Sequence, residues 1–346
     1  CSVHIKPDQA DGSLSSCHII YDAGSNGTRL YVYEQTTAGW VQHRGPKTHA
    51  LADPVRRIRG RTMSDAGTVV DAIVTALDDI RKDGPVEKNG KPLWPGFDWR
   101  KRCRIDTATV FATGGMRLAE QIDPDASELL WGMLDKKLET ALALPVTSRT
   151  ISGYEEGLFA WLAVREGQDD EGFAVAEMGG ASVQLTFPCD GCEASLPAKV
   201  KGDIVPIYSH SYLGWGQDEA WKQFAPLPAC AVGVGRENPD WQIGECLSGV
   251  RIESDPAAEL NGTLNDLQDL RWYLAGAFRY MQDSDIQRYC REGVVSDFEP
   301  ETSCFRAVYL QHVLDTLGVP AVSANSEVDW TLGAVICSAT RCLDVQ

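Results

Sequence analysis

The spacing of apolar positions changes along the chain, and these changes predict an α/β fold. Residues 19–21 (IIY) form an apolar run and residues 30–33 (LYVY) an apolar, aromatic run on either side of a glycine-containing turn, which is typical of a β-hairpin. Residues 63–83 and 124–142 instead repeat apolar side chains at helical spacing, and residues 104–111 return to a strand pattern. Residues 188–262 contain prolines and four cysteines and are predicted to be loop-rich surface.

A second segment repeats the plan of the first hairpin. Residues 173–187 (FAVAEMGGASVQLTF) run as an apolar strand into an acid, turn through glycines and leave along an alternating strand. Asp22 aligns with Glu177 and Gly24 with Gly179, 155 positions further on. That separation is about one domain, so two similarly built halves are expected, although two such hairpins can also arise independently.

The turn at residues 22–29 (DAGSNGTR) has the composition of a phosphate-binding loop. Glycines allow close backbone approach, and short hydroxyl and amide side chains stand beside several backbone N–H groups. An acid at the end of each strand can hold a hydrated divalent metal while the turn holds phosphate. An ordinary hairpin loop has a similar composition and is the alternative.

A glutamate in residues 151–157 (ISGYEEG) is a candidate general base. Ser152 and Glu155 stand three positions apart before an apolar helical run, which is the spacing of a capping box. Glu156 is then free, and we expect the amides of the helix start to keep it ionised and able to accept a proton. Two solvated glutamates are the alternative.

The charge and the cysteines narrow the class of protein. The formal net charge of −17 argues against binding to nucleic acid or anionic lipid, and the arginine clusters near residues 56–61 and 100–104 are interpreted as solvated surface. Eleven cysteines favour disulfides and an oxidising compartment, with zinc ligation as the alternative. The predicted pairs are Cys189–Cys192, Cys230–Cys246, Cys290–Cys304, Cys337–Cys342 and, more weakly, Cys17–Cys103.

The sequence begins with Cys1, so we expect a secreted chain whose export signal is absent, with lipid attachment at Cys1 as a further option. The sequence has no run of 18 or more apolar residues, so we expect no transmembrane segment.

Five motifs in order resemble the apyrases, the ecto-nucleoside triphosphate diphosphohydrolases, in the manner of a bacterial-type soluble member. The resemblance covers residues 17–337 and rests on residues 22–29 (DAGSNGTR), 112–118 (ATGGMRL), 152–157 (SGYEEG) with Trp161, 177–184 (EMGGASVQ) and 329–333 (DWTLG). Residues 208–216 (YSHSYLGWG) also resemble a family segment.

The resemblance implies an actin-like α/β fold in which two ribonuclease-H-like domains enclose an active-site cleft. Residues 1–158 with 326–346 would form the first domain, and residues 159–325 the second, with disulfide-rich loop insertions. The implied activity is Mg²⁺- or Ca²⁺-dependent removal of the terminal phosphates of nucleoside tri- and diphosphates, and a monomer is expected.

The resemblance also assigns roles to residues of this chain. The catalytic set would be Glu156 as the base, with Ser182 and Gln184 positioning the water. The phosphate contacts would be Gly24, Ser25, Asn26, Gly27, Thr28, Arg29, Thr113, Gly114, Gly179, Gly180 and Ala181. Asp22, Glu177 and Thr113 would hold the metal, mostly through water, and Phe278 and Tyr280 are candidates for the nucleobase, because residues 271–281 resemble the helix near that pocket.

Two positions depart from the family pattern. Glu177 replaces the usual aspartate, which puts the choice of metal in doubt, and Gly115 replaces the usual alanine, which is expected to loosen its turn. An exopolyphosphatase or sugar kinase on the same fold, and a nucleotide-gated binding module with slow hydrolysis, are the alternatives. The pair Ser182 and Gln184 favours water over a sugar hydroxyl as the acceptor.

Overall fold

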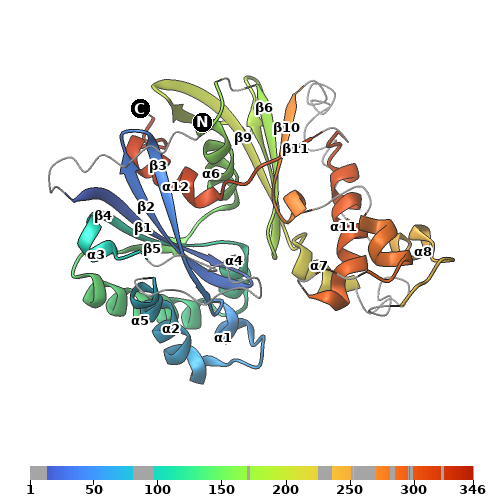
Figure 1. The fold of residues 1–346 in the computed structure, drawn as a ribbon, viewed down its shortest axis with the longest axis horizontal. Helices are drawn as coiled ribbons and strands as arrows, with labels where there is room; N and C mark the ends of the chain where they lie inside the picture. The colour runs from blue at the N-terminus through green and yellow to red at the C-terminus, as the bar shows by residue number, and fades with distance from the viewer. Residues whose placement is uncertain are drawn as a thin grey trace, which may run out of the picture. The chain divides into compact units, whose positions relative to one another are not determined.

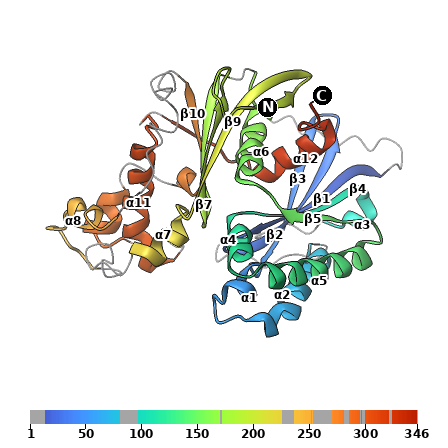
Figure 2. The ribbon, with the colours of Figure 1, turned by 180° about the vertical axis from the view of Figure 1, so that it is seen from behind.

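The described residues pack into two compact units, each built on one β-sheet (Figures 1 and 2). The structure is a computed structural model that describes residues 14–80, 97–169, 172–224, 236–250, 252, 270–280, 285–294, 296, 299–320 and 323–345. The first unit comprises Cys1–Ala23, Gly27–Phe111 and Asp125–Arg149, and the second Gly24–Asn26, Ala112–Pro124 and Thr150–Gln346. This grouping of contacts differs from the predicted domain boundaries, which stay a prediction.

The first unit is a five-stranded sheet with helices packed on it. The strand order is β3-β2-β1-β4-β5, with β1 Ser15–Gly24, β2 Gly27–Thr36, β3 Gly39–Thr48, β4 Cys103–Ala112 and β5 Thr147–Thr150. The helices are α1 Asp53–Arg56, α2 Ala66–Asp79, α3 Trp99–Arg102 and α5 Pro124–Leu142, with a 3₁₀ turn at Met63–Asp65. α2 packs on β2 and β3 because its apolar stripe faces the sheet.

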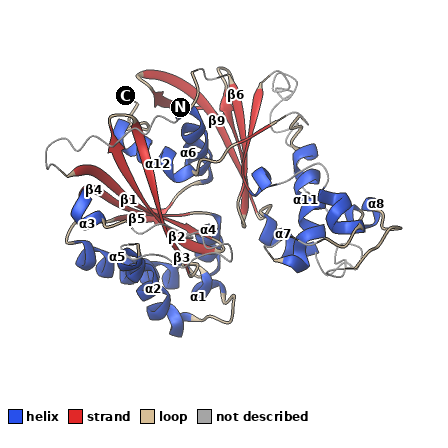
Figure 3. Ribbon diagram, viewed as in Figure 1, coloured by secondary structure: helices blue, strands red, loops and turns tan. Residues whose placement is uncertain are grey.

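The second unit is a six-stranded mixed sheet with helices on both faces (Figure 3). Its order is β11-β10-β6-β7-β9-β8, with β6 Phe173–Met178, β7 Ser182–Pro188, β8 Leu196–Val200, β9 Asp203–Leu213, β10 Arg271–Gly276 and β11 Ala324–Asn325. The helices are α4 Gly114–Ile122, α6 Gly153–Glu166, α7 Gln217–Phe224, α8 Ile243–Leu247, α11 Ser303–Thr316 and α12 Trp330–Thr340. Shorter helical turns occur at Ala277–Tyr280, Gln287–Arg291 and Pro300–Thr302.

The two sheets share one connectivity. If β1, β2, β3, β4 and β5 are matched to β6, β7, β9, β10 and β11, both sheets have the same strand order, and β8 is an extra edge strand of the second. The repeated hairpins therefore occupy equivalent places, β1–β2 in one sheet and β6–β7 in the other, which confirms the expectation of two similarly built halves.

The two faces of the second sheet differ in chemistry. Along β6 and β7, alternate residues such as Ala176 and Leu185 belong to an apolar core shared with α11. The intervening residues, including Gln184 and Thr186, lie on the face where α6 packs. The functional candidates are therefore set into a polar stripe between the sheet and α6.

Two expectations for this unit are wrong. Residues 188–262 were expected to be loop-rich surface, yet their described part contains β8, β9 and α7, and residues 207–213 of β9 pair with the whole of β7. On β9, serines occupy positions where aliphatic residues would indicate a strand, so the alternation of apolar and polar residues is weak. Residues 271–281 were expected to resemble a helix, whereas β10 pairs in parallel with β6 and only Ala277–Tyr280 is helical.

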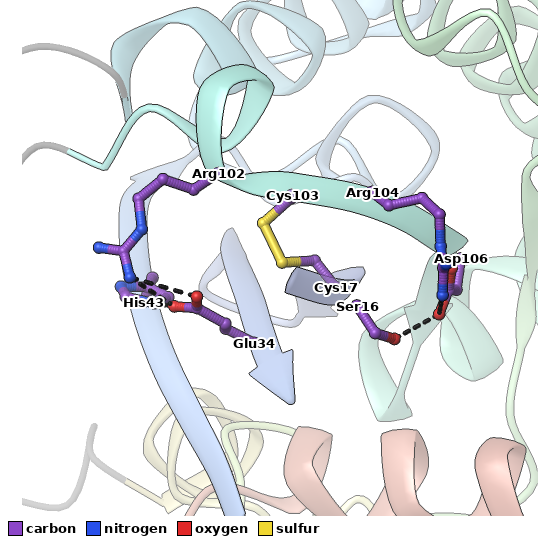
Figure 4. The surroundings of a disulfide bond; sticks show 8 residues. All are labelled: Ser16, Cys17, Glu34, His43, Arg102, Cys103, Arg104 and Asp106. Atoms are coloured by element: carbon purple, nitrogen blue, oxygen red, sulfur yellow. Dashed lines mark hydrogen bonds and ion pairs between the residues drawn. A yellow bond between two sulfur atoms is a disulfide. The ribbon is translucent and has the colours of Figure 1, made fainter. Parts of the chain in front are cut away.

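Four predicted disulfides are present in the described part of the chain: Cys17–Cys103, Cys189–Cys192, Cys290–Cys304 and Cys337–Cys342. Cys246 is also disulfide-bonded, and its predicted partner, Cys230, lies outside the described residues. The Cys17–Cys103 bridge joins β1 to the start of β4 (Figure 4). These pairings favour disulfides over zinc ligation.

Candidate active site

The start of α6 places Glu156 inside the protein. The Ser152 hydroxyl accepts from Glu155 N at 3.2 Å, and Ser152 N donates to Glu155 Oε2 at 2.9 Å. This confirms the predicted capping box, which turns Glu155 back onto the helix end. Glu156, one residue later, is only 4 % exposed. The two adjacent glutamates therefore have separate roles.

Arg117, on helix α4, contacts the Glu156 carboxylate. Its Nη2 donates to Glu156 Oε2 at 2.5 Å and to Ser182 Oγ at 3.0 Å, and its Nη1 donates to Ser211 Oγ at 3.2 Å. The Arg117 side chain is 15 % exposed. A shielded guanidinium thus ties the candidate base to two hydroxyls on the second sheet.

Gln184 of β7 contacts the same three groups. Its Nε2 lies 2.9 Å from Ser182 Oγ and 3.0 Å from both Glu156 Oε2 and Ser211 Oγ, so its two protons are shared among these three acceptors. Gln184 Oε1 is buried and has no hydrogen-bond partner in the described part of the protein. A buried acceptor of this kind is costly unless a bound molecule satisfies it.

Both serine hydroxyls lie between Arg117 and Gln184. Ser182 Oγ and Ser211 Oγ are each within hydrogen-bond distance of an Arg117 terminal nitrogen and of Gln184 Nε2. A hydroxyl can accept from these donors and still donate its own proton. The cluster therefore combines two serine hydroxyls, one amide acceptor, one carboxylate and the Arg117 guanidinium, whose Nε is buried without a partner among the described residues.

Burial raises the pKa of Glu156 above its ordinary value, and the charge and hydrogen bond of Arg117 oppose this shift without cancelling it. The amides of the helix start were expected to favour the Glu156 anion, and burial of the carboxyl group acts in the opposite direction. A raised pKa brings a carboxyl group closer to neutral pH and so makes it a better general base.

Two glycines of α6 let β9 approach this cluster. A Cβ at Gly153 would lie 2.1 Å from Cβ of Ser211, and a Cβ at Gly157 would lie 2.1 Å from Oγ of Ser209. Both positions must therefore lack a side chain. A third close contact fixes the other side of α6, where a Cβ at Gly333 of α12 would lie 1.8 Å from the carbonyl oxygen of Phe159.

The two glycine turns predicted to bind phosphate lie against each other within the second unit. A Cβ at Gly180 would lie 2.2 Å from Ser25 Oγ and 1.9 Å from Asp218 Oδ2. Asn26 Nδ2 donates to Asp218 Oδ2 at 2.5 Å, and Asp218 N donates to the carbonyl oxygen of Gly180 at 2.9 Å. Asp218, at the start of α7, thus connects the turns that contain Gly24 and Gly179.

The turn before α4 adjoins the same place. Thr113 is the N-cap residue of α4 and is buried, and a Cβ at Gly114 would lie 2.9 Å from Ser182 Oγ and 3.0 Å from Cβ of Ala181. A Cβ at Gly115 would lie 2.9 Å from Cα of Ser25. The missing side chain at Gly115 therefore leaves room for the turn that contains Ser25, and the expectation that Gly115 loosens its own turn stays a prediction.

The remaining predicted phosphate contacts lie in the first unit. Thr28 is 1 % exposed, and its N–H donates to the carbonyl oxygen of His49 at 3.1 Å. A Cβ at Gly27 would lie 2.4 Å from Cε of Lys47, and Arg29 Nη1 donates to Tyr31 Oη at 3.3 Å. The Thr28 amide is therefore already used in a hydrogen bond to the residue after β3.

The candidate metal residues supply oxygen donors. Glu177 is 7 % exposed at the end of β6 and lies opposite Gln184 across the β6–β7 ladder, while Asp22 lies on β1. A Cβ at Gly276, which has φ of +60°, would lie 2.4 Å from Glu177 Oε1, so this glycine leaves room for the extra methylene of Glu177. Among the described residues no group of three or more His, Cys, Asp or Glu side chains could hold a metal directly. Carboxylate and hydroxyl oxygens that act through water fit Mg²⁺ or Ca²⁺.

The two nucleobase candidates have opposite exposure. Phe278 is 0 % exposed and belongs to the core of the second sheet, so its ring has no free face. Tyr280 is 69 % exposed, and the Arg279 guanidinium lies 4.7 Å from its ring centroid.

Three site residues escaped the sequence analysis: Arg117, Ser211 and Asp218. Arg117 lies inside the second motif and Ser211 inside residues 208–216, and both segments had been singled out without a role for these side chains. Asp218 lies two residues beyond that segment. Motif membership was the available signal for the first two.

Comparisons with known proteins agree with the motifs. The profile of the GDA1/CD39 (nucleoside phosphatase) family matches residues 11–227. The chain is 25 % identical over 299 residues to ectonucleoside triphosphate diphosphohydrolase 2 of Mus musculus, covering 71 % of this chain and 54 % of that protein. It is 27 % identical over 231 residues to nucleoside-triphosphatase ntp-1 of Caenorhabditis elegans, covering 60 % and 39 %. The chain thus spans about half the length, or less, of these relatives.

Solved structures share the fold at low identity. An exopolyphosphatase-like protein superposes with a TM-score of 0.55 at 14 % identity, covering 95 % of this chain and 99 % of that chain. An exopolyphosphatase from Cytophaga hutchinsonii gives 0.53 at 12 % identity, covering 94 % and 98 %. These likenesses show the actin-like α/β fold alone. In the described part of the chain, no helix is long and apolar enough to cross a membrane.

Proposed function

Because this chain belongs to the GDA1/CD39 (nucleoside phosphatase) family, we propose that it removes terminal phosphates from nucleoside tri- and diphosphates with Glu156 as the general base. One observation carries the proposal. The buried Glu156 carboxylate lies in a cluster with the Ser182 hydroxyl and with Gln184 Oε1, a buried amide acceptor that has no hydrogen-bond partner among the described residues. That set matches what an attacking water molecule needs.

The cluster can satisfy three of the four hydrogen-bonding directions of a water molecule and leave the fourth for attack. One water O–H donates to Glu156 and the other to Gln184 Oε1, while the Ser182 O–H donates to one lone pair of the water. The second lone pair then attacks phosphorus. As the new P–O bond forms and the anhydride P–O bond breaks, the proton of the water passes to Glu156.

The contact between the glycine turns supports a shared phosphate site. Ser25, Asn26, Gly179, Gly180 and Ala181 would supply backbone N–H and short polar groups, and Thr113 with Gly114 would add the start of α4. The other contacts in this proposal are Gly24, Gly27, Thr28 through its hydroxyl, and Arg29.

Asp22, Glu177 and Thr113 would hold Mg²⁺ or Ca²⁺, mostly through water, and the metal when bound would neutralise charge on the phosphates. The room that Gly276 leaves for Glu177 supports this assignment. For the nucleobase, the exposed ring of Tyr280 beside Arg279 is the better of the two candidates. The disulfides favour an oxidising compartment outside the cytoplasm.

The test is release of inorganic phosphate from ATP, ADP, GTP and polyphosphate with Mg²⁺, Ca²⁺ or EDTA, comparing the wild type with Glu156→Gln. We expect metal-dependent release from the nucleotides and a loss of about 10²-fold or more in the variant, as for removal of a general base. Glu155→Gln is the matched control, because Glu155 caps the helix and should leave turnover nearly unchanged.

Other outcomes would replace this function. Release from polyphosphate alone would make the protein an exopolyphosphatase, and near-zero release with intact nucleotide binding would make it a nucleotide-gated binding module.

A further inference from the structure

Ser211 has a defined place in the active-site cluster that no motif assigned to it. It lies on β9 directly opposite Gln184 on β7, and its Oγ is 3.0 Å from Gln184 Nε2 and 3.2 Å from Arg117 Nη1. The absence of a side chain at Gly153 lets Ser211 pack against the start of α6. Ser211 therefore touches the groups around the base without lying on the base itself.

The orientation of the Gln184 amide decides whether the site can hold water. With Nε2 toward Glu156, Oε1 is the open acceptor, as observed. A flipped amide would set Oε1 against the Glu156 carboxylate, and two acceptors would repel each other. It would also turn an N–H donor toward the position of the water, which needs an acceptor there.

Ser211 strengthens that orientation. Its oxygen offers the Gln184 nitrogen an acceptor beside Glu156, and Arg117 Nη1 donates to the same oxygen and so holds it in place. We propose that Ser211 is a positioning residue that, with Arg117, holds the Gln184 amide with its nitrogen toward Glu156 and its oxygen toward the attacking water. This inference rests on the proposed function.

A matched residue lies two positions away on the same strand. Ser209 also faces α6, where Gly157 makes room for it, but its hydroxyl pairs with Thr186 Oγ1 at 2.8 Å. Ser209 thus resembles Ser211 in strand, orientation and packing and differs in its partner. A general effect of removing a serine from β9 should appear equally at both positions.

The experiment measures kcat and KM for ATP in the wild type, Ser211→Ala, Ser209→Ala, Gln184→Ala and the double variant Ser211→Ala/Gln184→Ala. We expect Ser211→Ala to lower kcat by about 10-fold to 100-fold with little change in KM, because small misplacements of catalytic groups cost up to about 10²-fold. Ser209→Ala should stay within about twofold of the wild type. In the Gln184→Ala background, Ser211→Ala should add almost no further loss, since it acts through Gln184.

Equal kcat values for Ser211→Ala and Ser209→Ala would overturn the proposal, as would multiplication of the two separate losses in the double variant. Thermal unfolding of each variant excludes a general loss of structure, and a drop in Tm for Ser211→Ala that alone accounts for lost activity would also count against it. If the wild type released no phosphate from any nucleotide, the proposed function would fail first, and that result differs from an active wild type with an unaffected Ser211→Ala.

Discussion

Two buried glutamates, one in each unit, pair with arginine and differ in what the pairing does. Glu34 and Glu156 are each 4 % exposed. Arg102 Nη2 lies 3.2 Å from both oxygens of Glu34 (Figure 4), and Arg117 Nη2 lies 2.5 Å from Glu156 Oε2. By composition alone the two pairs are the same kind of site.

Their pKa values nevertheless shift in opposite directions. Burial raises the pKa of Glu34, but hydrogen bonds from Ser15 and His43 and the charge of Arg102 outweigh it, so the pKa is lowered. At Glu156 burial prevails over Arg117, and the pKa is raised. Where hydrogen bonds and positive charge outweigh the desolvation cost, the carboxylate is stabilised in its ionised form and serves the structure. Where they do not, its pKa is raised and it accepts a proton more readily.

The largest expected effect concerns the surroundings of Glu34. Cys103 follows Arg102 in the chain and is bonded to Cys17 (Figure 4), and this bridge spans a sequence separation of 86. Replacing both cysteines by alanine should lower the free energy of unfolding by about 4.5 kcal/mol in the chain-entropy estimate. Urea denaturation measures the loss, and kcat of the folded fraction should not change.

The matched control is the double alanine variant of Cys189 and Cys192, whose separation is 3. Its loss should be about 2 kcal/mol because the closed loop is short. Equal losses for the two variants would contradict the role given to the long bridge.

The next prediction concerns the contribution of each glutamate to the free energy of unfolding. Glu34→Gln should lower the free energy of unfolding at pH 7 by about 1.5–3 kcal/mol, the size of a charged hydrogen bond. Because the folded pKa of Glu34 is lowered, its contribution is present above the unfolded value of about 4.3 and is lost as pH falls through the folded pKa. Urea denaturation at pH 7 and at acid pH should therefore show the gap between wild type and variant closing.

Glu156→Gln should behave in the opposite way. A raised pKa means that ionisation of Glu156 opposes folding as pH rises through that value, so the amide should not lower stability at pH 7. A clear loss of stability in Glu156→Gln would remove the distinction between the two glutamates.

The sequence predicted the shared features of the two units better than their differences. The repeated hairpins and the Ser152–Glu155 cap rest on local patterns, and both were found. β9 was missed because its inward residues are serines, and the pairing of Ser211 with Gln184 exists only once β9 lies beside β7. The burial that raises the pKa of Glu156 was missed for the same reason, since burial by residues distant in the sequence cannot be predicted from a helix start.

The smallest expected effect comes from replacing the arginine that pairs with each glutamate. Arg117→Ala removes the charge that lowers the pKa of Glu156, so that pKa should rise further and the base should be protonated up to a higher pH. The acid limb of the kcat/KM profile should move to higher pH, and this shift by itself should lower activity on that limb by about tenfold, the equivalent of about 1.4 kcal/mol, separately from any pH-independent loss caused by the lost contacts to Ser182 and Ser211. Arg102→Ala is the control, since its partner, Glu34, lies outside the proposed catalytic cluster and the acid limb should stay in place. If both variants shifted the limb equally, the profile would report general destabilisation, and Glu156 would no longer be distinguished as the titrating base.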